Sequence, residues 1–426
     1  MTFDTSLPAA PSPDAAAFHA LFEQVAAIGR TERGGLNRLA ASAEEGQARD
    51  VVCAWLAERG FAMQVDPVGN VFARLNLAPE AAGARDDVPC VLTGSHLDSQ
   101  PRGGRYDGAY GVIGACVAAD AIRRANPGGC RHDLAVVIWT NEEGARFAPS
   151  MLGSGVYAGH YATDYALARR DGQAVSLQEA LQAIGYHGSG QGPAQPAACV
   201  ELHIEQGPEL ERLGARIGVV EGNWGTMKYI VTFEGVAAHT GPTPMAERRD
   251  ALLAAGHLIV ACRALSDRTG GQLLSSVGRL DVEPNSTNVV AERVQLYAEM
   301  RATDNAMLEQ ACADFEQAVQ EAARQAGVQA SQVRVTDRPA GLFDAGLCAR
   351  IEQAAAGLGL DSRRLHTVAG HDAVSMRRRC PAAMVFVPSV KGISHNEAEH
   401  TAPEDLEAGI AVLASVLWGL VHQPAA

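Results

Sequence analysis

The sequence has 426 residues, 47% of them hydrophobic, and its formal net charge is −14 at pH 7. A chain of this length exceeds what a single core usually organises, so two domains are expected. The negative charge and the lack of a Lys/Arg-rich run argue against a nucleic-acid partner, and no apolar stretch reaches the length of a membrane span, so a small molecule is the expected partner.

The N-terminal part predicts two helices and no targeting signal. Ser12-Pro13-Asp14 is typical of a helix start with Pro at the first helical position, and a capping box from Ser42 to Glu45 predicts a second helix. The first residues lack the basic and apolar regions of a secretory signal. Because the nine cysteines also form no CxxC pair, we expect free thiols and a cytoplasmic protein.

Short apolar runs then alternate with helical stretches. The runs are NVFARLN, PCVLTG, LAVVIWT and CVELHIE, and the clearest helical stretch is GVIGACVAADAIRRA. Buried strands that alternate with helices predict an α/β sheet with both faces covered. In such a sheet, ligands bind beyond the carboxyl ends of the strands.

From about Trp224 the pattern changes. A strand (KYIVTFEG), a helix (AERRDALLAAGHLIVACRAL), two strands (SSVGRLDV and VQLYAEMRA) and a helix that starts near Asp304 follow one another. This β-α-β-β-α order predicts a compact α+β domain with its own sheet.

The α/β pattern then resumes with a helix, a strand and a final helix. We expect the final helix to begin at a capping box from Thr401 to Glu404, with Pro403 in its first turn. One domain is therefore interrupted by another. The first domain is assigned to residues 1–221 and 337–426, and the second to residues 222–336.

Imidazoles and carboxylates gather at the predicted strand ends. The segments are GSHLDS, GGRYDG, TNEEG, ELHIEQG and GISHNEAEH, and their candidate residues are His96, Asp98, Asp107, Glu142, Glu143, His203, Glu205 and His395. A hydrolytic metal site needs neutral imidazole and carboxylate ligands and a separate base for the water, and these segments supply both. A lone His-x-Asp or Glu-Glu pair is more often a solvated turn. Five such segments at successive strand ends favour a site.

These segments resemble the M20-type metallohydrolases, specifically the amidase, hydantoinase/carbamoylase branch that includes N-carbamoyl-L-amino acid hydrolase, β-ureidopropionase and allantoate amidohydrolase. The likeness runs from about residue 20 to the C-terminus. ELHIEQGP is its most specific part, because related peptidases usually carry a carboxylate where this chain has His203. The resemblance implies an α/β fold in which an aminopeptidase-like catalytic domain with a central mixed sheet is interrupted by an α+β lid and dimerisation domain.

The resemblance also implies two divalent cations, with zinc expected and manganese, cobalt or nickel as alternatives for such ligands. It makes His96, Asp107 and His203 ligands of one cation, and Asp107, Glu143 and His395 ligands of the other. Asp107 then bridges the two cations. Glu142 is implied as the general base that deprotonates the attacking water, and Asp98 is placed two residues after His96 to orient that imidazole.

Further positions match substrate-binding residues of the family. His239 is similar to a histidine that polarises the scissile carbonyl, and Asn288 and Arg301 match positions that hold the substrate carboxylate. An Arg fork binds a carboxylate bidentately. Without the resemblance, His239 is better interpreted as a surface loop histidine and Arg301 as an exposed strand-end charge.

Three residues complete the predicted pocket. Gln206 is expected to bind the carbamoyl or ureido group. Gly370 and His371, in the segment AGHDA, resemble a pocket-lining part of the family, although His371 is also compatible with a role at a helix N-terminus.

The resulting hypothesis is a homodimeric amidohydrolase that cleaves a linear, non-peptide C–N bond in an N-carbamoyl or ureido acid, such as an N-carbamoyl-L-amino acid, N-carbamoyl-β-alanine or allantoate. In the family, the histidine and arginine of the insert act across the subunit boundary. One alternative is an N-acyl amino acid deacylase or dipeptidase of the same superfamily, against which His203 argues. Another alternative is a catalytically silent binding relative, against which the complete set of ligand candidates argues.

Overall fold

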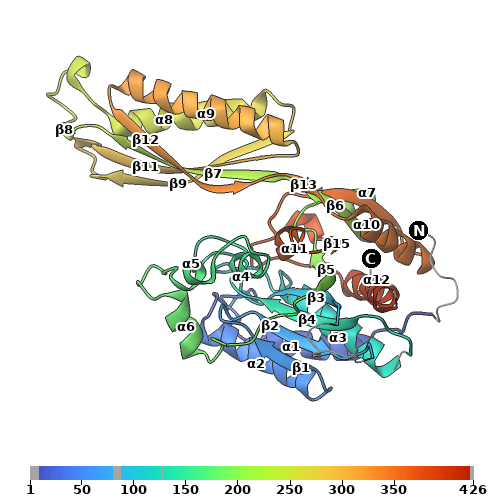
Figure 1. Cartoon of the computed structure of the whole chain (residues 1–426). Coiled ribbons are helices and arrows are strands. Elements are labelled where there is room, and N and C mark those ends of the chain that lie inside the picture. The colour runs from blue at the N-terminus through green and yellow to red at the C-terminus, as the bar shows by residue number, and fades with distance from the viewer. Residues whose placement is uncertain (1–8, 80–87, 126–127, 423–426) are drawn as a thin grey trace. The chain divides into compact units, whose positions relative to one another are not determined.

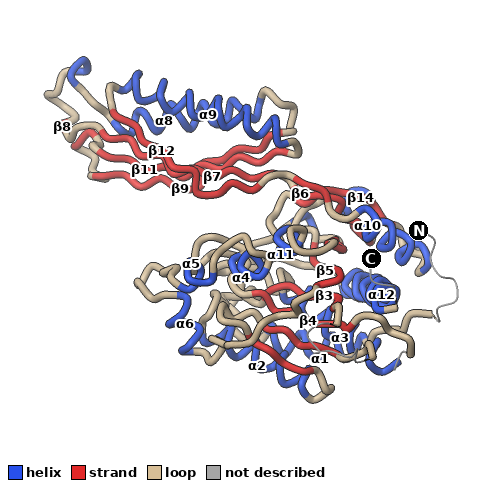
Figure 2. Tube along the Cα trace, viewed as in Figure 1, coloured by secondary structure: helices blue, strands red, loops and turns tan. Residues whose placement is uncertain are grey.

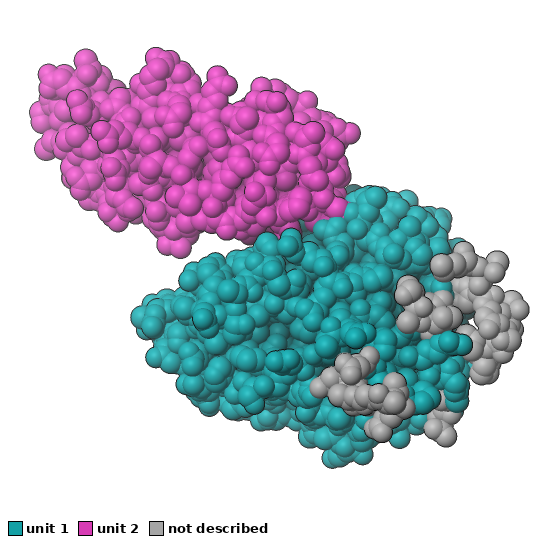
Figure 3. Space-filling view, viewed as in Figure 1, with its two compact units in different colours: residues 1–221, 342–426 teal, residues 222–341 magenta. Residues whose placement is uncertain are grey.

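The computed structural model describes residues 9–79, 88–125 and 128–422 (Figure 1). The chain divides into two compact units, one formed by residues 1–221 and 342–426 and the other by residues 222–341 (Figure 3). Within the described ranges, no helix combines the length and the apolar character that a membrane span requires.

A mixed sheet forms the centre of the larger unit. Among the described residues its strand order is β1-β2-β4-β3-β5-β15-β6-β13, and β14 pairs with β6. Strands β4, β3, β5 and β15 are parallel neighbours, whereas β2 runs antiparallel to β4 and β6 antiparallel to β15. The bounds are β1 Ala62–Val65, β2 Val71–Leu75, β3 Cys90–His96, β4 Asp133–Trp139, β5 Pro196–Ile204, β6 Ile217–Asn223, β13 Gly341–Leu342, β14 Ser362–Thr367 and β15 Ala382–Val387.

Helices cover this sheet (Figure 2). The bounds are α1 Ala15–Ala26, α2 Ala43–Ala57, α3 Ala109–Ala125, α4 Leu152–Tyr157, α5 Thr163–Leu167, α6 Leu177–Ala183, α7 Glu209–Leu213, α10 Ala345–Gly357, α11 Asp372–Met376, the 3-10 turn η3 Val390–Gly392, and α12 Pro403–Val421. Helices α3 and α12 pack against each other and against the central strands, and most of their residues are buried. The α/β class with a central mixed sheet is confirmed.

The first helix begins later than its sequence predicts. Asp14 is the N-cap of α1, and its carboxylate accepts the N–H of Ala17, so the predicted start with Pro13 inside the first turn is wrong. The Asp14 carboxylate accepts a free N–H of the first turn, so the helix starts after Asp14 and Pro13 lies outside it.

Only half of the capping box predicted at Ser42 forms. The Ser42 hydroxyl accepts the N–H of Glu45, but the Glu45 carboxylate binds the N–H of Ala41 and the guanidinium of Arg49. Arg49 is fully buried, and a buried cation requires an anionic partner. Its need for a counter-charge explains why Glu45 does not turn back to the cap.

The last helix begins at Pro403, inside the predicted first turn, but without the predicted capping box. Its N-cap is Ala402, which makes no side-chain capping bond. The Thr401 hydroxyl donates instead to the carbonyl of Pro388, 2.9 Å away.

The smaller unit is an antiparallel sheet covered on one face by two helices (Figure 1). Within the described residues the strand order is β12-β7-β11-β9, and β8 and β10 form a separate pair. The bounds are β7 Gly225–Glu234, β8 Ala238–His239, the 3-10 turn η2 Met245–Glu247, α8 Ala251–Asp267, β9 Leu273–Glu283, β10 Val289–Val290, β11 Arg293–Ala302, α9 Asn305–Ala326 and β12 Gln329–Arg338.

Strand β12 is missing from the β-α-β-β-α order that the sequence predicts. It lies at the edge of the sheet, and its sequence QASQVRVTDR is largely exposed. An edge strand of this kind lacks the regular apolar alternation by which half-buried strands are recognised. The two helices and the other three long strands are confirmed.

Candidate metal centre

The predicted ligands gather at one edge of the larger sheet. His96 is the last residue of β3, Glu142 and Glu143 follow β4, and His203 lies at the end of β5. Because these strands run parallel, their carboxyl ends meet at the same edge. His395 reaches the same place from the loop after η3.

Asp107, in the loop before α3, is the centre of the cluster. Its Oδ1 lies 3.5 Å from Nε2 of His96 and 3.2 Å from Nε2 of His203. Its Oδ2 lies 3.3 Å from Nε2 of His395, and that nitrogen lies 3.4 Å from Oε2 of Glu143. The two oxygens of one carboxylate therefore face two different sets of ligand atoms, which is the geometry of a bridging ligand.

Each set has the dimensions of a cation site. The ligand atoms of His96, Asp107 and His203 lie within 4.8 Å of one another, and so do those of Asp107, Glu143 and His395. The three residues of the first set are buried, whereas the His395 side chain of the second is 50% exposed.

The protonation of two imidazoles suits metal binding. Nδ1 of His96 lies 2.9 Å from the carbonyl of Asp98, and Nδ1 of His203 lies 2.9 Å from the carbonyl of Ile204. A carbonyl only accepts, so Nδ1 of each ring carries a proton. Nε2 then donates to Asp107 when the ring is protonated, and it is the atom that can coordinate a cation when the ring is neutral. Neutral imidazoles and carboxylates together form a donor set that fits divalent transition metals.

Asp98 contacts more than the histidine that it was expected to orient. Its Oδ1 is 3.5 Å from Nδ1 of His96. Its two carboxylate oxygens also accept the backbone N–H groups of Glu142 and Glu143, each over 3.2 Å. The side chain therefore holds the turn on which the candidate base and a candidate ligand lie.

Burial and charge perturb the acids of the cluster. Burial raises the pKa of Glu142 well above its usual value, and the carboxylates of Asp372, Glu143 and Asp98 add to this effect. Burial also acts to raise the pKa of Asp107, but hydrogen bonds with His203, His395 and His96 hold that pKa well below its usual value. A buried group of carboxylates that repel one another is stabilised by cations.

Gln206 contacts the bridging carboxylate in this structure. Its backbone has a φ of +58°, and its Nε2 donates to Oδ2 of Asp107 over 2.8 Å. Its backbone N–H donates to the Ser389 hydroxyl. The Gln206 amide is thus part of the cluster, at the position where the sequence predicts a contact with substrate.

His371 is packed behind the cluster. Its ring centroid lies 4.5 Å from that of His203, and its Nε2 lies 3.0 Å from the hydroxyl of Thr367. It occupies the N-cap position of α11 but makes no side-chain capping bond, so the capping interpretation is wrong. Gly370 precedes it in the loop between β14 and α11.

The remaining substrate-binding candidates belong to the smaller unit. His239, in β8, is exposed, and its Nδ1 accepts the N–H of Gly241 over 3.0 Å. Asn288 adjoins it, because its carbonyl accepts the N–H of Thr240 over 3.3 Å. Arg301, on β11, donates from Nε to Oε1 of Glu299 over 2.5 Å.

Glu205, a further candidate from the ELHIEQG segment, lies away from the ligand set. Its carboxylate accepts the backbone N–H groups of Glu209 and Leu210 over 2.7 Å and 2.9 Å. These N–H groups belong to the first turn of α7, where a carboxylate is favoured by the unpaired N–H groups. Glu205 therefore stabilises a helix start.

Sequence reasoning missed two buried acids around the cluster, Glu201 and Glu399, and it named Asp372 only as part of the AGHDA segment. Glu201 accepts the Ser95 hydroxyl and the N–H of Ala373, each over 2.7 Å. Asp372 is fully buried, and Glu399 is 4% exposed. Glu201 was recoverable, because it precedes His203 by two residues on one strand and therefore lies on the same face.

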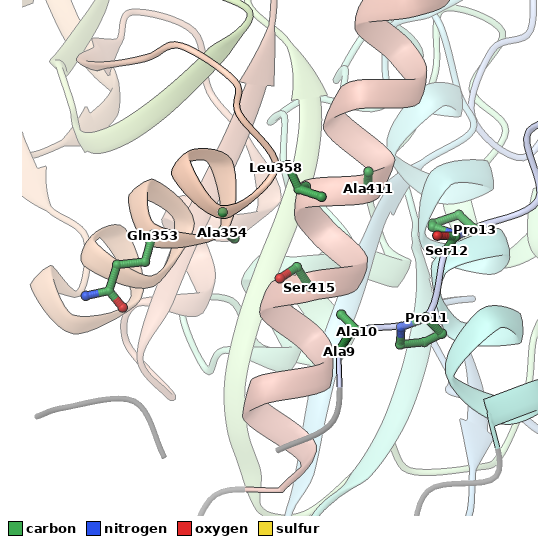
Figure 4. A pocket seen from close by; sticks show the side chains of 11 residues that line it. Ala9, Ala10, Pro11, Ser12, Pro13, Gln353, Ala354, Leu358, Ala411 and Ser415 are labelled. Atoms are coloured by element: carbon green, nitrogen blue, oxygen red, sulfur yellow. The ribbon is translucent and has the colours of Figure 1, made fainter. Parts of the chain in front are cut away.

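A cavity of about 360 Å³ lies elsewhere in the larger unit (Figure 4). It is bordered by residues 9–13 and by side chains of α10 and α12, including Gln353 and Ser415. The described residues that line it include no acid, histidine or cysteine, so it offers no acid–base or metal chemistry.

The metal-free protein is predicted to lose stability as the pH rises. A hydrogen bond to Asp107 raises the pKa of His395 from 6.5 to about 9, and burial raises the pKa of Glu143 from 4.5 to about 7. A group whose pKa is higher in the folded than in the unfolded protein binds its proton more tightly in the folded state. Its contribution to the free energy of unfolding is therefore full at a pH below the unfolded-state pKa, and it is lost as the pH rises through the folded-state pKa. The protein therefore loses the contribution of Glu143 between pH 4.5 and about pH 7, and that of His395 between pH 6.5 and about pH 9.

Thermal unfolding of chelator-treated protein, measured from about pH 6 to about pH 9, checks this expectation. The midpoint should fall across the range. Adding Zn²⁺ should release protons and remove the decline, because metal ligands bind in their deprotonated forms. A midpoint of the chelated protein that rises with pH would contradict the assigned ionisations.

Comparison with known proteins agrees with this geometry. The model of peptidase family M20/M25/M40 matches residues 92–419. The chain is 36% identical to an N-carbamoyl-L-amino-acid amidohydrolase of Rhizobium meliloti, with 92% of each chain covered, and 35% identical to an allantoate amidohydrolase of Bacillus subtilis, with 94% of this chain and 96% of the relative covered. A hydantoinase/carbamoylase family amidase from Burkholderia vietnamiensis is 38% identical to this chain in sequence. Its crystal structure superposes with a TM-score of 0.91, and the match covers 98% of this chain and 100% of that one. The chain therefore belongs to the M20/M25/M40 family and, within it, to the hydantoinase/carbamoylase amidases.

Proposed function

We propose that this protein is a dinuclear amidohydrolase that cleaves a linear, non-peptide C–N bond in an N-carbamoyl or ureido acid. The observation that carries the proposal is the placement of Asp107, whose two oxygens face two separate ligand sets. The similarity to amidohydrolases of N-carbamoyl-L-amino acids and of allantoate extends over nearly the whole chain and supports the substrate class.

Five residues would hold the two cations. His96 and His203 complete the first site and Glu143 and His395 the second, with Asp107 shared. We propose zinc, with manganese, cobalt or nickel as alternatives, because imidazole and carboxylate donors accept all four. When bound, such cations act as Lewis acids towards the substrate oxygen and lower the pKa of the attacking water.

Glu142 is proposed as the general base. It is buried, and its Oε2 lies 3.6 Å from Nε2 of His96, beside the ligands but outside both sets. Burial raises the pKa of Glu142, and a carboxylate with a raised pKa is a stronger base for the proton of water than an exposed glutamate. Glu142 takes a proton from water as the water oxygen bonds to the carbonyl carbon, and it gives that proton to the nitrogen as the C–N bond breaks.

His239, Asn288 and Arg301 are proposed to bind substrate, His239 at the carbonyl oxygen and the other two at the carboxylate. The orientation of Arg301 is set by Glu299, whose second oxygen, Oε2, lies 2.9 Å from Nζ of Lys228. An Arg whose Nε is already fixed presents its outer nitrogen atoms in a defined plane, as bidentate carboxylate binding requires. Gln206, Gly370 and His371 are proposed to line the pocket.

The nine cysteines are free, which supports a reducing compartment, and we propose that the protein is cytoplasmic.

We propose a homodimer formed through the smaller unit. Helix α8 exposes Leu252, Leu253, Ile259 and Val260, and Val260 is 71% exposed. The neighbouring strand β9 is an edge strand of its sheet and exposes Leu274. A second copy of the same surface would cover these apolar side chains and pair with the strand edge.

Replacement of the base should abolish turnover without removing metal. Glu142→Gln keeps the size of the side chain but cannot accept the proton of water, so we expect kcat to fall by a factor of about 100 to 10,000. Metal content, measured by elemental analysis, should stay at the wild-type value. Glu143→Gln is the matched comparison, because it should lose metal as well as activity. A Glu142→Gln enzyme with near wild-type turnover would reject the assignment.

The substrate class is tested by a panel of compounds. Ammonia release should be found with N-carbamoyl-L-amino acids, N-carbamoyl-β-alanine or allantoate, and no comparable hydrolysis should be found with N-acyl amino acids or dipeptides. Arg301→Lys should raise KM for the preferred acid about tenfold, because Lys retains the charge but loses the fork. Arg293→Lys, on the same strand face, is the control. Preference for a dipeptide would favour the peptidase alternative.

The dimer is tested by light scattering during gel filtration. The wild-type protein should have the mass of two chains. Val260→Glu should produce single chains, because it places a charge in the covered surface. Val333→Glu is a suitable control, since Val333 is 61% exposed but lies on β12, the opposite edge of the sheet. A wild-type protein with the mass of one chain would disprove the proposal.

A further inference from the structure

Glu399 connects two loops that carry candidate metal ligands. Its Oε1 accepts the backbone N–H groups of Tyr106 and Asp107, over 3.0 Å and 3.1 Å. Its Oε2 accepts the hydroxyl of Ser394, the residue before His395, over 2.8 Å. The carboxylate is buried among these groups, at 4% exposure. One side chain thus joins the Asp107 loop to the His395 loop.

The space around Glu399 is shaped to hold its carboxylate. A Cβ atom at Gly104 would lie 1.9 Å from the carboxyl carbon of Glu399, so a side chain at that position would displace the carboxylate. The bond network continues through Gln206, whose Nε2 lies 3.2 Å from the Ser394 hydroxyl and 2.8 Å from Oδ2 of Asp107. Glu399 is therefore connected to Asp107 in two ways. It accepts the backbone N–H of Asp107 directly, and it is linked to Oδ2 of Asp107 through Ser394 and Gln206.

The two ligand sets depend on these contacts to different degrees. In the first set, the rings of His96 and His203 are buried and each is held by a carbonyl. In the second set, His395 is 50% exposed and has a φ of +51°, an unfavourable backbone conformation for a residue with a side chain. Among the described residues, no hydrogen bond holds its Nδ1. The position of His395 therefore rests on its loop.

We propose that Glu399 is a positioning residue that sets the affinity of the second cation site, formed by Asp107, Glu143 and His395, without binding the cation. This inference rests on the ligand assignments of the proposed function. By accepting hydrogen bonds from both loops, Glu399 fixes the separation of Asp107 and His395. Loss of these bonds allows the exposed loop to move, and a cation site loses affinity when its ligands are no longer held in place.

The test is calorimetric titration of metal-free protein with Zn²⁺, in competition with a chelator of known affinity. Wild type should bind two cations. Glu399→Ala should bind the first with an affinity within about threefold of wild type and the second about 10 to 100 times more weakly. Excess Zn²⁺ should restore its kcat. Glu399→Gln should be intermediate, because its amide oxygen can still accept the two backbone N–H groups.

Glu397→Gln is the matched control, since Glu397 lies in the same loop but contacts Thr31, and it should bind both cations as wild type does. Ser394→Ala removes one contact of Glu399 and serves if Glu399→Ala does not fold; it too should weaken only the second site. Equal weakening of both sites, or a second site of unchanged affinity in Glu399→Ala and Ser394→Ala, would overturn the inference. A wild-type protein that binds no cation would instead refute the proposed function.

Discussion

The structure depends on keeping the Asp107 carboxylate ionised in a buried position. Removing a carboxylate from water is costly unless hydrogen bonds or charges compensate it. Asp107 receives this compensation from His96, His203 and His395 and from the amide of Gln206. These groups come from segments far apart in the chain. The parallel strands of the α/β sheet bring them together, because their carboxyl ends lie along one edge.

The turn that bears Glu142 is held from two sides. On the side of the ligand cluster, the Asp98 carboxylate accepts the backbone N–H groups of Glu142 and Glu143. On the other side, Asn70 accepts the N–H of Thr140 and donates to the carbonyl of Gly153. A Cβ at Gly153 would lie 2.2 Å from the Asn70 oxygen, so the close approach requires glycine. The proposed base is therefore held in place, and a base that needs little reorganisation during a reaction lowers its barrier.

The smaller unit separates packing from chemistry through the alternation of its strands. Along β11, Ala298 and Met300 are buried in the core beneath the helices, whereas Glu299 and Arg301 lie on the opposite face. Lys228 lies directly opposite Glu299 on β7 and pairs with it. The core can therefore stabilise the sheet without constraining which polar side chains the other face carries. An arginine on a paired central strand is also held more rigidly than one on a loop.

The sequence by itself determined the α/β class, the interrupted order of elements and the identity of the ligand candidates. Ligand chemistry is a property of residue type, and apolar periodicity reports directly on strands and helices that bury one face or both. Only the tertiary structure decided that Glu399 lies against the amide of Asp107, 292 residues away, and that Gln206 donates to that carboxylate. It also decided that β12 forms and that Glu45 binds Arg49 in place of its own cap. The first three of these features arise from contacts between distant segments. The Glu45–Arg49 pair is local, but it depends on the burial of Arg49 against Gly69 and Thr140. Because such packing involves the whole chain, it leaves no periodic signal in the local sequence.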